Sequence, residues 1–150
     1  MKKLNFLLFF LSFILLSSLS YSQSSVNPWQ TLYEGQGIKI EFRKVDCNPS
    51  KSSIQMEEVY LKFTNTMDKL IEVDWQYDVT YGDKCYNCEG GLAEMSQTVK
   101  LENLSSLTAE CGDENYFRLR IFSRFLNMEN DRELTDFHVK EIVVREISRD

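Results

Sequence analysis

Residues 71–81 read IEVDWQYDVTY, and this stretch decides the fold. Apolar or aromatic residues take every second position, namely Ile71, Val73, Trp75, Tyr77, Val79 and Tyr81. Polar residues fill the positions between them. Because successive side chains of a β-strand point to opposite faces, a period of two is typical of a strand with one buried face. The sequence therefore predicts a half-buried strand that directs Trp75 into the core.

Shorter runs with the same alternation lie on both sides of this strand. They span residues 38–47, 56–65, 94–101, 107–111, 117–121 and 137–144. The alternation changes parity near Val45 and Cys47, and again between Val139 and Ile142, which predicts a β-bulge in each run. Short alternating runs separated by polar turns are typical of antiparallel sheets. We therefore expect an all-β fold, an antiparallel β-sandwich of about seven strands in a single domain.

Two neighbouring runs carry a resemblance to a known fold family. The segment Val59-Tyr60-Leu61-Lys62-Phe63-Thr64-Asn65-Thr66, followed by Ile71-Glu72-Val73-Asp74-Trp75, resembles strands B and C of an immunoglobulin-like or fibronectin-type-III-like domain. The resemblance covers about 20 residues and implies an Ig-like β-sandwich with Trp75 packed between the sheets. Residues 59–63 contain no cysteine, so the inter-sheet bridge of antibody domains is not expected. A resemblance of fold implies no activity.

The amino terminus has the pattern of an export signal. Lys2 and Lys3 precede an uncharged apolar run from Leu4 to Leu19, and small residues follow in Ser20-Tyr21-Ser22. This order predicts a signal peptide over residues 1–22, cleaved between Ser22 and Gln23, with cleavage after Ser20 as the alternative. A retained anchor is disfavoured because a membrane span needs roughly 20 apolar residues. We expect an exported domain of residues 23–150, periplasmic or secreted, with no transmembrane segment after cleavage.

The charge of the chain limits its partners. Removing Lys2 and Lys3 from the 17 basic residues leaves 15 against 23 acidic residues, a net charge of −8. Nucleic-acid binding needs a concentrated cationic surface that attracts phosphates. A nucleic-acid partner is therefore not expected.

All four cysteines, Cys47, Cys85, Cys88 and Cys111, lie beyond the predicted leader. An even number of cysteines in a small exported domain indicates structural disulfides. The predicted strand directions bring all four to the same end of the sandwich, as bridging requires. Of the three complete pairings, we favour Cys85–Cys88 with Cys47–Cys111, although the sequence alone does not choose between them.

Two other interpretations of the cysteines remain open. The first is a thiol–disulfide oxidoreductase that uses Cys85 and Cys88, but the following Glu89-Gly90-Gly91 opens no helix that would stabilise a thiolate. The second is a zinc site of four thiolates. Structural zinc sites usually draw on two close pairs of ligands, whereas this chain has one pair and two single cysteines.

The remaining candidate residues have simple structural interpretations. We expect Glu72, Asp74 and Asp78 to form a solvated acidic face, because no loop is present that would wrap a calcium ion. Cations from neighbouring strands, Lys62, Arg118 and Arg120, are expected to balance it. His138 is the only histidine and is expected to be exposed, with no Ser-His-Asp arrangement.

The apolar residues Phe122, Phe125, Leu126 and Met128 follow a run in which Phe117, Leu119 and Ile121 are expected to face inward. They form either a second apolar layer under the 127–135 loop or an exposed patch for a partner. We favour the packed layer.

Together these observations favour a non-enzymatic β-sandwich that acts as a binding or adaptor module of the cell envelope. Its partner would be a protein or a glycan, and we expect no catalytic residue, cofactor or metal. The alternatives are the oxidoreductase described above and a purely structural domain.

Overall fold

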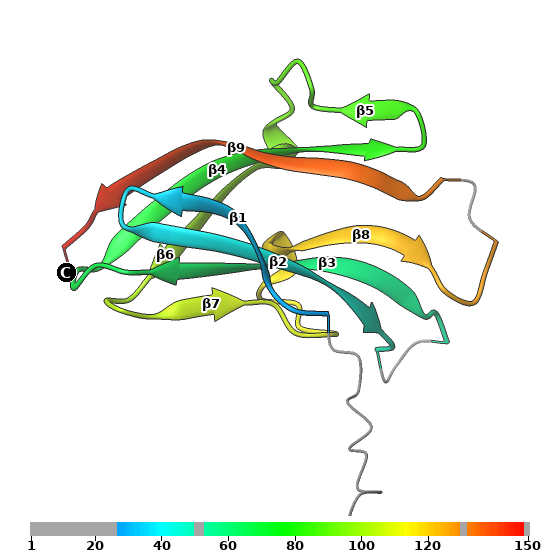
Figure 1. Ribbon diagram of the computed structural model, residues 1–150, viewed down its shortest axis with the longest axis horizontal. Coiled ribbons are helices and arrows are strands. Elements are labelled where there is room, and N and C mark those ends of the chain that lie inside the picture. The colour runs from blue at the N-terminus through cyan, green and yellow to red at the C-terminus, as the bar shows by residue number, and fades with distance from the viewer. Residues whose placement is uncertain (1–26, 50–52, 130–131, 149–150) are drawn as a thin grey trace, which may run out of the picture.

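The computed structural model describes residues 27–49, 53–129 and 132–148 (Figure 1). The predicted signal peptide and its cleavage site between Ser22 and Gln23 lie outside the described residues. Within the described part of the chain, no helix is long and apolar enough to cross a membrane.

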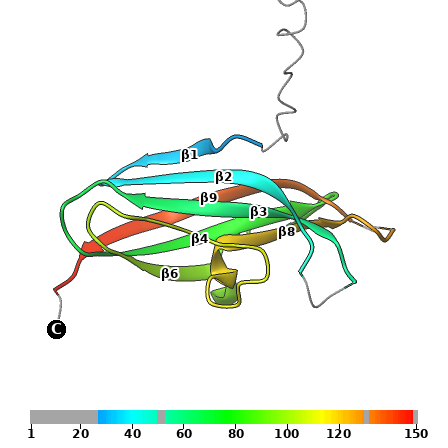
Figure 2. The same cartoon turned by 90° about the horizontal axis from the view of Figure 1, so that it is seen from below.

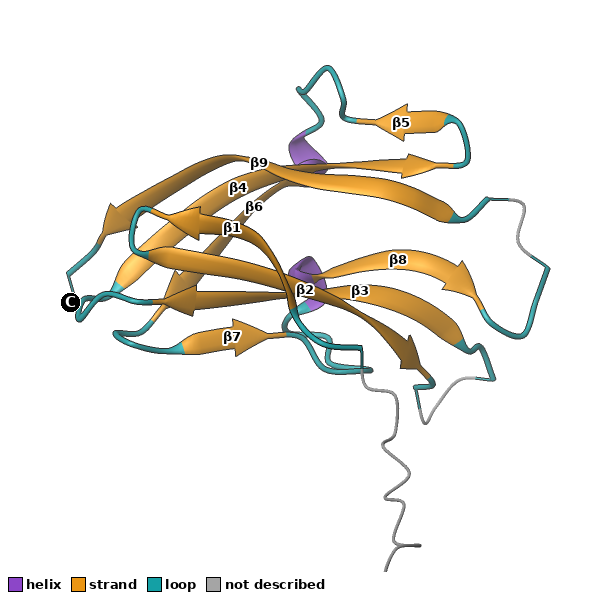
Figure 3. Cartoon of the chain, in the orientation of Figure 1, coloured by secondary structure: helices purple, strands orange, loops and turns teal. Residues whose placement is uncertain are grey.

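The described residues form an all-β fold of nine antiparallel strands, two more than expected, with two short 3-10 helices (Figure 3). The strands are β1 (Gln30–Gly35), β2 (Ile38–Cys47), β3 (Met56–Asn65), β4 (Ile71–Tyr81), β5 (Lys84–Tyr86), β6 (Ser96–Leu101), β7 (Ser106–Thr108), β8 (Arg120–Phe125) and β9 (Leu134–Glu146). The 3-10 helices are η2 (Ala93–Met95) and η3 (Phe117–Leu119). The two strands that the sequence analysis missed, β1 and β5, lack a clear alternation of buried and exposed residues.

The strands form two sheets that lie one above the other, with β2 above β4 and β6 in Figure 2. The first sheet has the order β1-β2-β3-β7, and β8 also pairs with β3. The second has the order β5-β4-β6, and β9 pairs with β4. The strand formed by residues 71–81 is therefore central, with β5 and β6 along one side and β9 along the other.

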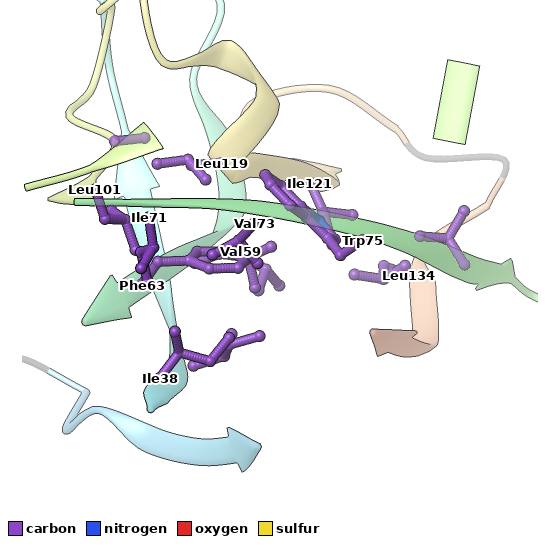
Figure 4. Packing of buried hydrophobic residues seen from close by; sticks show 14 residues of the cluster. Ile38, Val59, Phe63, Ile71, Val73, Trp75, Leu101, Leu119, Ile121 and Leu134 are labelled. Carbon is purple, nitrogen blue, oxygen red and sulfur yellow. The ribbon is translucent and has the colours of Figure 1, made fainter. Parts of the chain in front are cut away.

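The core fills the space between the sheets (Figure 4). The aromatic rings of Phe63 on β3 and Trp75 on β4 lie 4.5 Å apart and join the two layers. Trp75 is 1% exposed, as expected from its position in the alternating stretch. The alternating residues Ile71, Val73 and Val79 are buried on the same face of β4.

One predicted bulge is confirmed and the other is wrong. In the β4–β9 pair, Val143 is opposite Asp74 and Lys140 is opposite Gln76, so two residues of β9 share the space opposite Trp75. One of these two is Glu141, whose φ of 51° is left-handed. In contrast, the register between β2 and β3 has no shift. Cys47 is buried because it is bonded to Cys111, not because a bulge has turned the strand.

The expectation that Phe117 faces inward is also wrong. The amide of Leu119 donates a hydrogen bond to the carbonyl of Tyr116, which closes the single turn of η3. Phe117 lies in this turn and is 56% exposed, and strand β8 begins only at Arg120. Leu119 and Ile121 are buried as predicted.

Candidate functional site

A cleft of about 650 Å³ lies at one edge of the sandwich. One wall is β6 of the second sheet, and the other is β7 with η3 of the first. Its lining consists of Trp75 and residues 98–102, 105–107 and 115–119. We call this feature the edge cleft.

Trp75 contributes an unusual group to the edge cleft. Its indole nitrogen Nε1 is buried and has no hydrogen-bond partner among the described residues. Buried polar groups are nearly always paired, and a buried indole N–H normally finds an acceptor. Trp75 lines the edge cleft but is only 1% exposed, so an acceptor on a bound molecule would reach this donor only after the side chains that cover it move.

Aromatic side chains stand at the rim of the edge cleft. Tyr116 is 39% exposed, and Phe117 is more exposed still. The guanidinium group of Arg118 lies 5.6 Å from the centre of the Phe117 ring. Exposed aromatic residues beside arginine are typical of the anchors of protein interfaces. Their exposure was not predicted, because the alternation of residues 119–121 was extended back to Phe117, although the polar run 112–115 directly before Tyr116 signals a turn.

The wall formed by β6 also has a free hydrogen-bonding edge. Within the described residues, β6 pairs with β4 and with no other strand. The opposite side of the sandwich differs, because there the two sheets touch. The rings of Phe42 on β2 and Phe137 on β9 lie 5.1 Å apart, and the side chain of Gln36 donates to the carbonyl of Ile142 over 3.4 Å. The hollow edge is therefore the β6–β7 side.

The four cysteines lie in two disulfide-like pairs, the same pairs that the sequence analysis favoured. Cys47 pairs with Cys111 at a Cα–Cα distance of 5.4 Å, which ties the end of β2 to the loop after β7. Cys85 pairs with Cys88 at 6.0 Å. Among the described residues, the sulfurs of Cys85 and Cys88 gather with Asp78 rather than with the other two cysteines. The arrangement therefore does not form a site of four thiolates.

The acidic residues of β4 form ion pairs with basic residues of β9. The guanidinium group of Arg145 bonds both Glu72 and Asp74. Hydrogen bonds from Thr98 and then from Arg145 lower the pKa of Asp74. The predicted partners are wrong, because Lys62 pairs with Glu41, Arg120 pairs with Glu58, and Arg118 lies beside Phe117. These three residues belong to the other sheet or to η3, whereas β9, one of the strands that pair with β4, supplies the cations.

Asp78 was expected to lie on a solvated face, but its side chain is buried. Its carboxylate lies 2.9 Å from Nδ1 of His138 and 3.2 Å from Nζ of Lys140, both on β9. The His138 side chain itself is 65% exposed, as predicted. The hydrogen bond to Asp78 raises the pKa of His138 above its usual 6.5.

This contact predicts a pH-dependent contribution to stability. A histidine whose pKa is raised in the folded state stabilises the fold fully below about pH 6.5 and loses that effect as the pH rises through the folded pKa. His138→Gln should therefore lower the free energy of unfolding below about pH 6.5. This loss should become smaller as the pH rises through the folded pKa of His138. The difference should stay below about 1 kcal/mol, because the pair is solvent-exposed on the histidine side. Urea unfolding of both proteins across this pH range measures it, and a difference that does not change with pH would contradict the role of His138.

The apolar cluster formed by β8 and the residues after it is only partly packed. The rings of Phe122 and Phe125 lie 4.8 Å apart, and the hydroxyl of Tyr81 donates to the carbonyl of Phe122 over 2.7 Å. Leu126 and Met128 are exposed. Phe122 and Phe125 are half-buried and in contact with each other, whereas the predicted packing is wrong for the exposed Leu126 and Met128.

No protein-family model, no curated protein and no solved structure matches this chain. A functional assignment therefore depends on the geometry of the edge cleft and of the Cys85–Cys88 pair.

Proposed function

We propose that this protein is an exported, non-enzymatic binding module that holds an extended segment of a partner protein in the edge cleft. The observation that carries the proposal is the unsatisfied indole N–H of Trp75 in a cleft bordered by the free edge of β6. An edge strand offers a row of unpaired backbone donors and acceptors to another chain.

The shape and chemistry of the edge cleft favour a polypeptide ligand. An extended peptide can add a strand to a free sheet edge, and its alternate side chains then enter the adjoining hollow. One of its carbonyl groups would accept the hydrogen bond of Trp75 once the side chains that cover the indole N–H have moved aside. Phe117 and Tyr116 would cover an apolar side chain at the rim. Two basic residues, Lys100 and Arg118, and one acidic residue, Glu102, line the edge cleft, so its lining carries a small net positive charge that favours an acidic residue in the partner.

Export belongs to the same proposal. The signal pattern of residues 1–22 directs the domain out of the cytoplasm, and two disulfide-like cysteine pairs suit an oxidising space. The resemblance of residues 59–75 to an Ig-like domain implies no function. The module would act in the periplasm or outside the cell.

The oxidoreductase alternative is weakened by the surroundings of the cysteine pair. A thiol enzyme needs a stabilised thiolate, usually at the amino terminus of a helix. Cys85 instead lies on strand β5 and Cys88 in the turn that follows it. Glu89 follows the motif directly and adds an acidic group.

The binding proposal is tested with a displayed library of random linear peptides selected on the purified domain. We expect selected peptides to bind wild type, and Trp75→Phe and Phe117→Ala each to weaken binding at least about tenfold, the loss expected for a hot-spot contact. Trp75→Phe keeps one aromatic ring in the core but removes the N–H donor together with the second ring of the indole. Val143→Ala is the matched control, because Val143 is an exposed apolar residue on β9 and does not line the edge cleft.

Three outcomes would overturn the proposal. Selected peptides that bind Phe117→Ala and Trp75→Phe as tightly as wild type would show that another surface is used. Binding on a glycan array with no peptide selected would assign a carbohydrate ligand instead. Self-association that blocks selection and is relieved by Phe117→Ala would show that a second copy of the chain occupies the edge cleft.

A further inference from the structure

Asp78, Cys85 and Cys88 form a compact group on the second sheet. One carboxylate oxygen of Asp78 and the two sulfurs all lie within 4.8 Å of one another. Asp78 comes from the second half of β4, Cys85 from β5, and Cys88 from the turn that follows β5. Carboxylate oxygens and thiolate sulfurs are both ligands that zinc accepts.

The turn between the two cysteines is held in place by Asn87, independently of the disulfide. The Asn87 side chain donates to the carbonyl of Tyr77 over 2.9 Å and accepts from the amide of Leu92 over 3.1 Å. Its backbone carbonyl accepts from the amide of Gly90 and from Nζ of Lys140. The residue has a φ of 64°, a left-handed conformation that asparagine tolerates better than most residues. Opening the disulfide would therefore leave the turn in position over β4.

We propose that opening of the Cys85–Cys88 bond by an external dithiol converts this group into a zinc site with Cys85, Cys88 and Asp78 as ligands. The dithiol is oxidised to its own disulfide, and its two electrons and two protons yield the two cysteine thiols. Zn²⁺ then binds both sulfurs, and the two thiol protons pass to solvent. Water completes the tetrahedral set of ligands.

The distances suit this conversion. Two sulfurs bound at about 2.3 Å to a tetrahedral zinc ion stand about 3.8 Å apart, so the sulfurs must separate by a little under 2 Å after reduction. The carboxylate lies within 4.8 Å of both sulfurs and needs only a small approach. Cys85 is half-buried and Cys88 is exposed, which gives a reductant and a metal ion access.

Contacts from β9 already fix the carboxylate of Asp78. Nδ1 of His138 lies 2.9 Å from one of its oxygens, and Nζ of Lys140 lies 3.2 Å from the other. His138 and Lys140 both contact the carboxylate of Asp78, so they would hold its orientation when the zinc ion binds. Hydrogen bonds of this kind to a metal-bound carboxylate fix ligands in other metal sites.

Zinc titration of the full mature domain, oxidised and after treatment with a dithiol, tests the inference. A competing chromophoric chelator gives the affinity, and Co²⁺ in place of zinc reports sulfur ligation through a charge-transfer absorption band. We expect one ion per chain in the reduced protein and none in the oxidised protein. Asp78→Asn should weaken binding at least about tenfold, and Cys85→Ser with Cys88→Ser should abolish the cobalt band.

Glu89→Gln is the matched control, because Glu89 is an exposed carboxylate directly beside Cys88. It should bind zinc like wild type. Equal zinc affinity in the oxidised and reduced proteins would overturn the inference, and so would binding that Glu89→Gln weakens and Asp78→Asn does not. If Asp78→Asn fails to fold, the cobalt spectrum of wild type and of the double serine variant still decides the matter. The peptide selection above uses oxidised protein, so the two proposals fail independently.

Discussion

Replacing Trp75 by alanine is expected to lower the free energy of unfolding by about 3–5 kcal/mol, the usual cost of deleting a buried aromatic side chain. Trp75 is almost fully buried and packs on Phe63 across the two sheets. Because small domains are stable by only about 5–15 kcal/mol, the variant would be marginal. Urea unfolding followed by circular dichroism gives the change.

Trp75→Phe is the control for this prediction. It retains a ring against Phe63 and removes a donor that has no partner among the described residues, so its cost should be well below that of alanine. A Trp75→Ala protein that unfolds within about 1 kcal/mol of wild type would show that this ring does not anchor the core.

Removing the Cys47–Cys111 bridge is the second large expected effect. The two cysteines are 64 residues apart in sequence, and a bridge closing such a loop restricts the unfolded chain by about 4 kcal/mol in the chain-entropy model. The double variant Cys47→Ala, Cys111→Ala should lose stability of this order in urea unfolding. The intact mass of native wild type should be four hydrogens below that of the reduced chain.

The second pair provides a comparison within the same molecule. Cys85 and Cys88 are 3 residues apart, and the same model gives under about 2 kcal/mol for so short a loop. Cys85→Ala with Cys88→Ala should therefore cost clearly less than the first double variant. Equal losses from the two double variants would contradict this explanation and point to strain or packing at one of the bridges.

The sequence predicts the central strand well because its environment is regular. β4 has neighbours on both sides and one face in the core, so burial alternates along it from Ile71 to Trp75. Short strands on the edge lack this signal, and the three residues of β5 cannot display a period. The class of fold was therefore predictable, while the number of strands was not.

The candidate site was less predictable, because it depends on which segments become neighbours. The acidic residues of β4 were visible in the sequence, but nothing local shows that Arg145 and Lys140 would reach them from β9. The edge cleft depends on a gap between β6 and β7, which belong to different sheets. The alternation that correctly buries Trp75 also gives no sign that its N–H is left without a partner.

The most direct test of the binding proposal is backbone hydrogen exchange of the domain with and without a selected peptide. If the peptide adds a strand to the free edge, amides of β6 (Ser96–Leu101) should exchange more slowly in the complex. Amides of β1, the edge strand on the other side of the first sheet, should be unchanged. Protection that appears on β1 or β9, or that is absent from β6, would contradict the proposed use of the edge cleft.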